Sequence, residues 1–285
     1  MLPASSHGAC DTCDSPASDF DLQATGPAGA RHGLPWPPHS AWQRAWSWLP
    51  TQCLLCRGWQ HHSVCRRCIA RWQPDVPRCP RCAIGMPEGR TDVCQTCEDA
   101  SPEFDRAITA LDYTAPWSPL LARLKFHGAT ALARPLGDLL AAAVQPRRGR
   151  VSLLLPVPLS GERLAERGFN QSWLLAQRVA MRLNLRAHPG VVGRVRHTQR
   201  LMAMTAEERQ QAIGDAFAIQ ADAAHLLRGR HVAVIDDVLT TGATLNAVSR
   251  VLLDAGARSV SAWVVARTPA PGTLEARAHQ DGHQR

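Results

Sequence analysis

The stretch HVAVIDDVLTTGATLNAVSRVLLDAGA, residues 231–257, gives the strongest indication of the fold. It begins with an apolar run, residues 231–235, and this run ends in two adjacent carboxylates, Asp236 and Asp237. A loop of small and hydroxylated residues follows, and then a helical pattern with apolar residues on one face. Strand, loop and helix in this order predict one unit of an α/β fold, in which ligands bind beyond the carboxyl ends of the strands.

The loop at residues 238–244, VLTTGAT, has the composition of a phosphate-binding site. Gly242 lets the backbone approach a ligand closely. Amide N–H groups at the start of the helix, together with the hydroxyls of Thr240, Thr241 and Thr244, can bind a phosphate dianion. No lysine follows Gly242 as a P-loop requires, and the chain has no G-x-G-x-x-G, so neither of those nucleotide sites is expected.

Asp236 and Asp237 distinguish this loop from other phosphate sites. Carboxylates at a strand end can accept hydrogen bonds from two neighbouring sugar hydroxyls, and here they stand beside a phosphate loop. The alternative is that the two aspartates only cap the turn.

The chain from residue 102 onward alternates between extended and helical patterns. Apolar extended runs occupy residues 107–113, 151–158, 231–238 and 259–266, and helical patterns occupy residues 120–144, 171–183 and 244–256. This alternation predicts an α/β domain with a mainly parallel sheet over residues 101–270. Residues 1–50 are rich in Ala, Pro, Ser and Gly, and we expect a disordered or loosely ordered extension there, with a short helix at residues 40–50. The polar tail, residues 271–285, is expected to be flexible.

The segment RLAERGFNQ, residues 163–171, follows an apolar strand and carries two arginines. Arg163 and Arg167, with Asn170 and Gln171, could clamp a pyrophosphate group through bidentate contacts. The alternative is a basic helix start whose arginines are solvated, and the residues alone do not favour either.

All ten cysteines fall in five C-x-x-C pairs. Two such pairs complete a tetrahedral zinc site, and disulfides are disfavoured in a chain without a secretion signal. We predict a zinc-binding module at residues 51–100 with one or two structural zinc ions, and both sequential and interleaved pairings are open. Its ligands are Cys53, Cys56, Cys65, Cys68, Cys79, Cys82, Cys94 and Cys97. Cys10 and Cys13 lie apart in the N-terminal extension, where we expect no metal.

Composition and charge exclude only a few classes of protein. The 285 residues are 45% hydrophobic and 20% charged, and no run approaches the ~18 apolar residues of a membrane span. The net charge of +8 favours nucleic acid as a partner, but eight zinc-bound thiolates and two zinc ions would reduce it to roughly +4. The N-terminus has neither the basic start nor the apolar segment of a secretory signal, so we expect a cytoplasmic protein.

Taken together, these motifs resemble those of the ComF family of competence-related proteins. The segment VIDDVLTTGAT, residues 234–244, looks like the phosphoribosyl pyrophosphate (PRPP) motif of type I phosphoribosyltransferases. The ComF family also carries an N-terminal cysteine module, an LKxxG element and a PVPL…RGFNQ element. The matching segments here are RLKFHG at residues 123–128 and LPVPLSGERLAERGFNQ at residues 155–171. The match runs from about residue 53 to residue 268.

The resemblance implies a fold, a ligand and a role for each part of the site. The fold is a five-stranded parallel sheet topped by a hood. Asp236 and Asp237 would hold the ribose hydroxyls, and residues 240–244 would hold the 5-phosphate. Mg²⁺ would bridge ribose and pyrophosphate oxygens. The whole set of expected PRPP ligands is Asp236, Asp237, Val238, Leu239, Thr240, Thr241, Gly242, Ala243 and Thr244.

Lys125 is the only lysine among 32 basic side chains, and it stands in the LKxxG element. A compact ammonium group on a flexible stem fits pockets that a planar guanidinium does not. We therefore predict that Lys125 binds a pyrophosphate oxygen and, with the two aspartates, belongs to the catalytic residues. The alternative is a chance lysine on a solvated face.

The sequence departs from the family between its two main motifs. Relatives commonly carry T-x-x-Q, then an arginine and an asparagine before AF. This chain keeps Thr198 and Arg209, but has Leu201 in place of the glutamine and Ala212 in place of the asparagine. We expect this departure to affect either the choice of the acceptor or the packing of the hood.

Three functions remain open at this point. The resemblance implies a role in natural competence, with internalised single-stranded DNA and the DNA-uptake machinery as partners. The PRPP motif is also typical of a salvage phosphoribosyltransferase that acts on a base or an amine. A third function is a PRPP-sensing or DNA-machinery adaptor without turnover. The sequence leaves the acceptor and the oligomeric state open.

Overall fold

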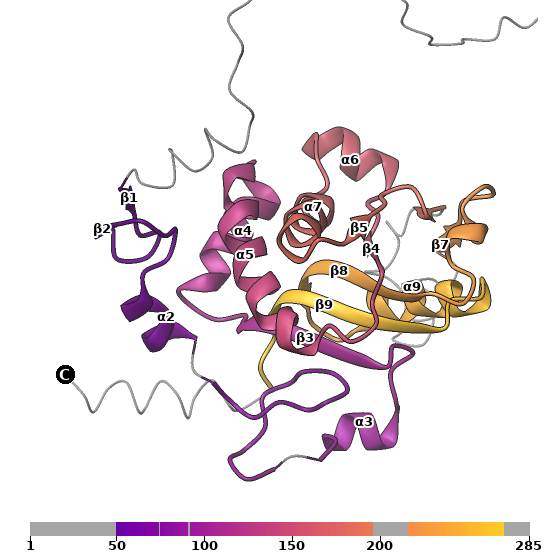
Figure 1. Ribbon diagram of the computed structural model, residues 1–285, viewed down its shortest axis with the longest axis horizontal. Coiled ribbons are helices and arrows are strands. Elements are labelled where there is room, and N and C mark those ends of the chain that lie inside the picture. The colour runs from indigo at the N-terminus through magenta and orange to yellow at the C-terminus, as the bar shows by residue number, and fades with distance from the viewer. Residues whose placement is uncertain (1–49, 74, 91, 196–215, 271–285) are drawn as a thin grey trace, which may run out of the picture. The chain divides into compact units, whose positions relative to one another are not determined.

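Five parallel strands form the central sheet of the structure, a computed structural model that describes residues 50–73, 75–90, 92–195 and 216–270. Their order across the sheet is β3 (Arg106–Asp112), β9 (Ser259–Arg267), β8 (His231–Leu239), β4 (Leu153–Pro156) and β5 (Arg186–Ala187) (Figure 1). The predicted α/β fold with a parallel sheet is confirmed.

Some sequence predictions fall outside these residues. They concern the N-terminal extension with Cys10 and Cys13, the short helix at residues 40–50 apart from Pro50, and the tail at residues 271–285. The described residues all belong to one compact unit, Leu49–Arg285.

Helices connect the strands. They are α4 (Trp117–Phe126), α5 (Ala133–Val144), α6 (Gly161–Arg167), α7 (Gln171–Leu183) and α9 (Ala243–Asp254), with 3-10 turns η1 (Thr130–Leu132), η2 (Gln145–Arg147) and η4 (Ala224–Leu226). The helical pattern at residues 120–144 is divided between α4 and α5. Gly128 has φ +62°, in the left-handed region that ends a helix, and η1 leads into α5.

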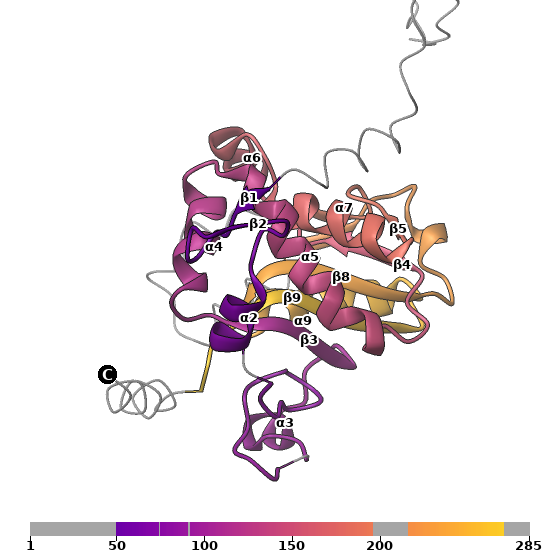
Figure 2. The same ribbon diagram turned by 60° about the vertical axis from the view of Figure 1, so that its left-hand side comes forward.

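The two faces of the sheet bury different residues of the same strands. Ala233 and Ile235 of β8 pack against the core that α4, α5 and α7 cover, whereas Val232 and Val234 face the core that α9 covers. Figure 2 shows α5 and α7 lying over the sheet. A strand that is covered on both faces reads as a continuous apolar run, which explains the pattern HVAVI before the two aspartates.

The direction of the chain reverses across the middle of the sheet. From β4 the chain leads to β5 on one side, and from β8 it leads to β9 on the other, while β4 and β8 pair directly. After two such strands the chain leaves in opposite directions, and this opens a crevice at their carboxyl ends. The fold therefore predicts a ligand site between the residues that follow β4 and β8.

A small antiparallel sheet stands beside α9. It consists of β6 (Val192–Arg194) and β7 (Phe217–Ile219), and the residues between them, 196–215, are not described. Phe217 is buried in the core under α9.

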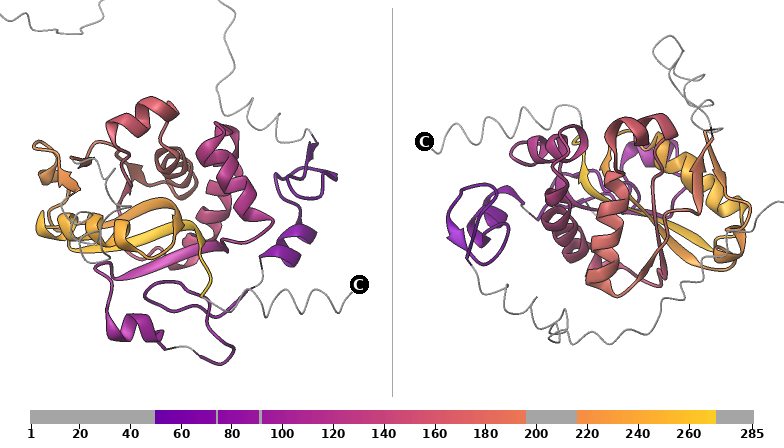
Figure 3. Two further views of the ribbon diagram at one scale, coloured as in Figure 1. Left: turned by 180° about the vertical axis from the view of Figure 1, so that it is seen from behind. Right: turned by 90° about the horizontal axis from the view of Figure 1, so that it is seen from above.

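The cysteine-rich region contains β1 (Thr51–Gln52), β2 (Trp59–Gln60), α2 (Arg66–Trp72) and α3 (Gln95–Asp99). Figures 1 and 3 show α2 and α3 well apart from each other. The part with α2 is bound to α4, because Trp117 Nε1–H donates to the Trp72 carbonyl at 2.6 Å. The part before α3 is bound to β3 through a 2.6 Å hydrogen bond from the Ala107 N–H to the Arg81 carbonyl.

Candidate functional site

A cavity of about 290 Å³ opens at the carboxyl ends of β4 and β8, at the point where the chain reverses direction. Four separate segments of the chain supply its charged and polar lining. These residues are Lys125 of α4, Arg163 and Arg167 of α6, Gln171 of α7, Arg194 of β6, and Asp236, Asp237, Thr240 and Thr244 from the end of β8 and the loop after it. The three motifs found in the sequence therefore meet in one place.

The two aspartates at the end of β8 lie in different surroundings. Asp237 is buried, with 2% of its surface exposed, whereas Asp236 is half-buried. Asp236 Oδ1 accepts hydrogen bonds from the Ser172 hydroxyl and from the Asp237 N–H, both at 2.8 Å. Asp237 Oδ1 accepts from the Val238 N–H at 3.0 Å. Both carboxylates are thus held in place before any ligand binds.

Lys125 forms an ion pair with Asp237. Its Nζ lies 3.1 Å from Asp237 Oδ2 and 3.2 Å from Oδ1. The lysine comes from the last turn of α4, so the ion pair connects that helix to the end of β8. The lysine side chain is about one third exposed and is part of the lining of the cavity.

Burial and charge determine the protonation of Asp236. Burial, and then the neighbouring charge of Asp237, raise the pKa of Asp236 to about 7, although Lys125 and the Ser172 hydroxyl act in the opposite direction. A carboxyl group with this pKa changes its charge near neutral pH. It can accept hydrogen bonds from sugar hydroxyls, or approach a metal ion, once it is ionised.

The loop after β8 divides between two cavities. Val238, Thr240 and Thr244 line the large cavity, while Thr241 and Gly242 line a smaller one of about 90 Å³ next to the second group of cysteines. Of the other predicted ligands in the loop, Leu239 is buried in the core and Ala243 is the first residue of α9. Gly242 has φ +88°, a conformation that favours glycine, and this residue begins the helix.

The predicted pyrophosphate clamp is a short helix, α6, and the turn after it. Ser160 caps α6 by accepting from the Arg163 N–H at 3.4 Å, and Arg167 donates to Gln171 Oε1 at 2.7 Å. The Arg167 guanidinium also lies 5.6 Å from the ring centre of Phe126. Both arginines line the cavity.

Asn170, the remaining residue of that prediction, is the N-cap of α7. Its Oδ1 accepts from the N–H groups of Ser172 and Trp173 at 2.9 and 3.3 Å, and its Nδ2 donates to the Val157 carbonyl at 3.0 Å. Both the oxygen and the nitrogen of the side chain take part in these contacts, and Asn170 is not among the residues that line the cavity. The structure therefore gives Asn170 the task of positioning Ser172, which in turn holds Asp236.

The eight cysteines of residues 51–100 form two groups of four, in sequential pairing. One group is Cys53, Cys56, Cys65 and Cys68, and the other is Cys79, Cys82, Cys94 and Cys97. Within each group all sulfurs lie within 4.8 Å of one another. The Cys56–Cys65 and Cys82–Cys94 sulfurs are 3.8 and 3.6 Å apart, close to the ~3.8 Å that a tetrahedral site with Zn–S bonds of about 2.3 Å requires.

Backbone N–H groups favour a thiolate in each group. Burial alone would raise the pKa of Cys53, but N–H groups of residues such as Cys56 and Cys65 hydrogen-bond its sulfur and lower the pKa to about 6. The same balance, with N–H groups of Cys82 and Cys94, lowers the pKa of Cys79 to about 7. Burial and the neighbouring cysteines raise the pKa of Cys68, Cys94 and Cys97, so a thiolate is favoured at one cysteine of each group. Deprotonated sulfur is the form that binds metal, and the spacing of the four sulfurs is what fits a metal ion such as zinc in both groups.

The chain is similar to known proteins over most of its length. A phosphoribosyl transferase domain model matches residues 170–280. The chain is 34% identical over 229 residues to the DNA utilization protein YhgH of Escherichia coli K12, which covers 77% of this chain and 98% of that protein. It is 31% identical over 224 residues to Competence protein F of Haemophilus influenzae, with 76% and 96% covered. For Competence protein ComFC of Bacillus subtilis the identity is 28% over 240 residues, with 76% and 95% covered.

The chain belongs to the ComF family. Its phosphoribosyltransferase-like sheet, its flanking helices and its two four-cysteine groups all agree with what the sequence resemblance implied. None of the helices in the described part of this ComF-family chain is long and apolar enough to cross a membrane. Thr198, Leu201, Arg209 and Ala212, where the departure from the family pattern was noted, lie outside the described residues.

Sequence reasoning missed three residues of the site in this ComF-family chain. Ser172 holds Asp236, and its place directly after the GFNQ element is a signal that could have indicated it. Arg194 adds a further cation to the cavity, and burial, with a smaller effect of Arg163, lowers its pKa. Arg267, at the end of β9, donates to the carbonyls of Leu239 and Thr240. No local pattern in the sequence indicates Arg194 or Arg267.

Proposed function

We propose that this chain binds PRPP together with Mg²⁺ in the cavity at the ends of β4 and β8. The observation that carries the proposal is the convergence of two carboxylates, a helix-start loop with threonines, and four cations in one cavity. The cations are Lys125, Arg163, Arg167 and Arg194. They outnumber the two aspartates, which suits a ligand that carries a phosphate and a pyrophosphate group.

Each part of the site has a task in this proposal. Asp236 and Asp237 accept hydrogen bonds from the ribose hydroxyls, and the loop from Thr240 to Thr244 binds the 5-phosphate through N–H and hydroxyl groups. Arg163 and Arg167 bind the pyrophosphate, with Lys125 on the same side. Mg²⁺, when bound with the ligand, neutralises charge on the pyrophosphate, and the two aspartates are the carboxylates that could hold it.

Transfer of the ribose phosphate would follow from this arrangement. The bond between C1 of the ribose and the pyrophosphate oxygen breaks, and its electron pair leaves with the pyrophosphate. A lone pair of an acceptor nitrogen forms the new bond to C1, and the proton that this nitrogen loses passes to water. The sugar passes through a cationic, oxocarbenium-like state, which the fixed carboxylates of Asp236 and Asp237 stabilise.

We also propose that the two cysteine groups bind structural zinc, and that the protein acts in the use of DNA taken up by the cell. The sulfur spacing and the lowered pKa of Cys53 and Cys79 support the metal. The names of the relatives, DNA utilization protein and competence protein, support the cellular role. Internalised single-stranded DNA and the uptake machinery are the partners that this role requires.

Calorimetric titration with PRPP and Mg²⁺ tests the site. We expect saturable binding to the wild type and its loss in the Asp236→Ala/Asp237→Ala double variant. Asp254→Asn, an exposed aspartate near the end of α9, is the matched control and should bind as the wild type does. A wild-type protein that does not bind PRPP would contradict the proposal.

Two further measurements separate the remaining functions. Pyrophosphate release, measured over a panel of bases and amines, distinguishes a phosphoribosyltransferase from an adaptor that binds PRPP without turnover. Deletion of the gene in a competent host, with DNA binding and transformation scored separately, tests the role in DNA use. Normal transformation in the deletion strain would remove that role.

A further inference from the structure

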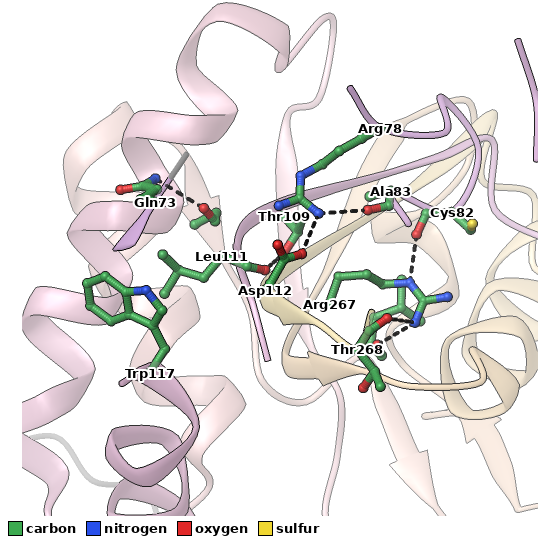
Figure 4. A network of polar contacts seen from close by, with 12 residues as sticks. Gln73, Arg78, Cys82, Ala83, Thr109, Leu111, Asp112, Trp117, Arg267 and Thr268 are labelled. Atoms are coloured by element: carbon green, nitrogen blue, oxygen red, sulfur yellow. Dashed lines mark hydrogen bonds and ion pairs between the residues drawn. The ribbon is translucent and has the colours of Figure 1, made fainter. Parts of the chain in front are cut away.

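Arg267 connects the second cysteine group to the phosphate loop. Its Nε donates to the Cys82 carbonyl at 3.0 Å (Figure 4). Its Nη1 donates to the Leu239 carbonyl at 3.0 Å and to the Thr240 carbonyl at 2.6 Å. A further bond from Nη1 reaches the Thr268 carbonyl at 3.0 Å. The side chain is 8% exposed, so these hydrogen bonds of a charged donor are sheltered from water.

The two loop carbonyls that Arg267 binds determine where the next N–H groups point. In a trans peptide the carbonyl oxygen and the following N–H point in opposite directions. Hydrogen bonds that turn the Leu239 and Thr240 carbonyls toward Arg267 therefore turn the N–H groups of Thr240 and Thr241 away from it. Both N–H groups belong to the loop that, in the proposed function, binds the 5-phosphate.

The cysteine side of this connection is also fixed. Arg78 donates to Asp112 Oδ1 at 2.9 Å and to the Ala83 carbonyl at 3.2 Å (Figure 4). The Arg81 carbonyl accepts from the Ala107 N–H. The turn that carries Cys79 and Cys82 is thus held against β3. Cys82, Cys94 and Cys97 line the 90 Å³ cavity together with Thr241 and Gly242 of the phosphate loop.

The first cysteine group has different contacts. Its module meets α4 and β3 through Trp117, which donates to the Trp72 carbonyl, and through Gln73, which donates to the Ala110 carbonyl at 3.0 Å. Both groups consist of four cysteines with similar spacing of their sulfurs. Within the part of the chain that the structure describes, only the second group is joined by a hydrogen bond to Arg267, the residue that holds the phosphate loop. The first group therefore serves as an internal control.

We propose that Arg267 is a positioning residue that couples metal binding at Cys79, Cys82, Cys94 and Cys97 to phosphate binding at the loop of residues 240–244. A metal ion fixes the Cys79–Cys82 turn and with it the Cys82 carbonyl, which orients the guanidinium toward the loop. This inference rests on the proposed function for the identity of the ligand. Coupling of two binding sites is reciprocal for their equilibrium affinities, so a ligand on the loop must raise the metal affinity of the second group by the same factor, and leave that of the first unchanged.

The first test needs no ligand. Amide hydrogen exchange is measured on the zinc-loaded full chain for residues 240–244, with β8 residues 232–236 as the reference. Arg267→Gln and Cys94→Ser should each speed exchange in the loop about tenfold and leave β8 protected. Arg250→Gln, which breaks an exposed ion pair with Glu103, and Cys56→Ser, in the first group, should leave the loop at the wild-type rate.

The second test measures the coupling itself. Zinc release to a chromogenic chelator is measured at equilibrium over a range of chelator concentrations, with and without PRPP and Mg²⁺, and also with inorganic phosphate. In the wild type we expect PRPP to raise the affinity of the chain for one of the two zinc ions about tenfold, and so to lower its release, which lies within the usual range of coupling between sites. Arg267→Gln should abolish this effect, and Arg267→Lys should restore a part of it, because an ammonium group can donate to a loop carbonyl but not in a planar fork.

The outcomes separate the two proposals. A wild-type protein that binds no PRPP, but whose loop exchange rises in Arg267→Gln and Cys94→Ser, would contradict the proposed ligand and leave the coupling supported. PRPP binding without any change of zinc release, or unchanged loop exchange in both variants, would overturn the coupling. Loss of protection in β8 as well as the loop would indicate general unfolding and would also count against a positioning role.

Discussion

Lys125 Nζ lies 3.1 and 3.2 Å from the two carboxylate oxygens of Asp237, so one ammonium group contacts both oxygens of a side chain that is only 2% exposed. The lysine was predicted on the pyrophosphate side of the site. In the structure it lines the same cavity as Arg163 and Arg167, but its charge is directed to the aspartate. One cation thereby reduces the repulsion between Asp236 and Asp237, as its lowering effect on the pKa of Asp236 indicates.

The first prediction concerns Lys125→Arg. A guanidinium is planar and larger than an ammonium group, so it cannot keep the same contact with Asp237 without moving the end of β8 or α4. We expect PRPP binding to weaken about tenfold, which corresponds to ~1.4 kcal/mol. Titration calorimetry measures the change. Arg123→Lys, the same exchange in reverse on the exposed side of α4, is the control and should bind as the wild type does. If Lys125→Arg bound PRPP with unchanged affinity, the choice of lysine at this position would have no role in ligand binding.

The second prediction is a pH dependence of stability that comes from Asp236. Its pKa is about 7 in the folded protein, above the ~3.9 of an unfolded chain, so the folded state holds this proton more tightly. The contribution of Asp236 to stability is therefore fully present below about pH 4, falls as the pH rises through the window from 4 to 7, and is constant above it. Asp236→Asn removes this dependence.

Chemical denaturation at pH 6 and pH 8 measures the effect. Relative to the wild type, Asp236→Asn should gain roughly 1 kcal/mol in free energy of unfolding between these two pH values. The change is taken as the difference between Asp236→Asn and the wild type, because pH affects the cysteine groups equally in both proteins. Asp254→Asn, with an exposed carboxylate, should show no such gain. An equal pH dependence of Asp236→Asn and the wild type would mean that Asp236 is ionised well below pH 7.

The third prediction concerns metal content. Metal analysis of the purified chain should give two zinc ions per molecule, and Cys97→Ser should remove one of them. Cys53 and Cys68 are part of the core that contains α4 and α5, whereas Cys79, Cys94 and Cys97 form a small cluster of their own. Cys68→Ser should therefore lower the midpoint of thermal unfolding more than Cys97→Ser. A folded chain without metal would contradict the zinc assignment.

The sequence indicated which residues of one strand–loop–helix unit lie near a common site, because they follow directly after an apolar run and local rules for phosphate loops apply to them. In the structure Asp236, Asp237, Thr240 and Thr244 line the large cavity, whereas Thr241 and Gly242 line the smaller one, and their role in phosphate binding stays a prediction. The parallel sheet could also be predicted, because a strand buried on both faces has an uninterrupted apolar pattern. The pairing of the cysteines was open, since both pairings place C-x-x-C turns together, and only the folded chain selects one.

Residues that act across long separations could not be predicted. Arg267 is 185 residues from Cys82 and 28 from Leu239, and only the pairing of β8 with β9 brings these groups together. Asn170 illustrates a different difficulty. An asparagine before a helix is a common N-cap, but the motif around it favoured a ligand, and the sequence contains no information on which contact its side chain makes.

The last prediction concerns the close approach of α5 and α7. A Cβ atom on Gly137 would lie 2.8 Å from both Cβ and Cγ of Arg178, and the head of this arginine is held by two hydrogen bonds of 2.8 Å to Asp138. In an ordinary helix, replacing glycine by alanine stabilises by up to ~1 kcal/mol. Here the methyl group has no space, because the stem of Arg178 is anchored, so Gly137→Ala should instead lower the free energy of unfolding by ~1–3 kcal/mol.

Urea denaturation followed by tryptophan fluorescence measures this effect, and the chain offers a matched control. Gly161, the first residue of α6, has open space around its Cβ position and no positive φ. Gly161→Ala should therefore be neutral or stabilise by up to ~1 kcal/mol. Arg178→Ala in the background of Gly137→Ala should recover a part of the lost stability, because it removes the atom at Cγ that the new methyl group meets. If Gly137→Ala proved as stable as Gly161→Ala, α5 and α7 would have room to separate. The close contact at Gly137 would then contribute nothing to stability.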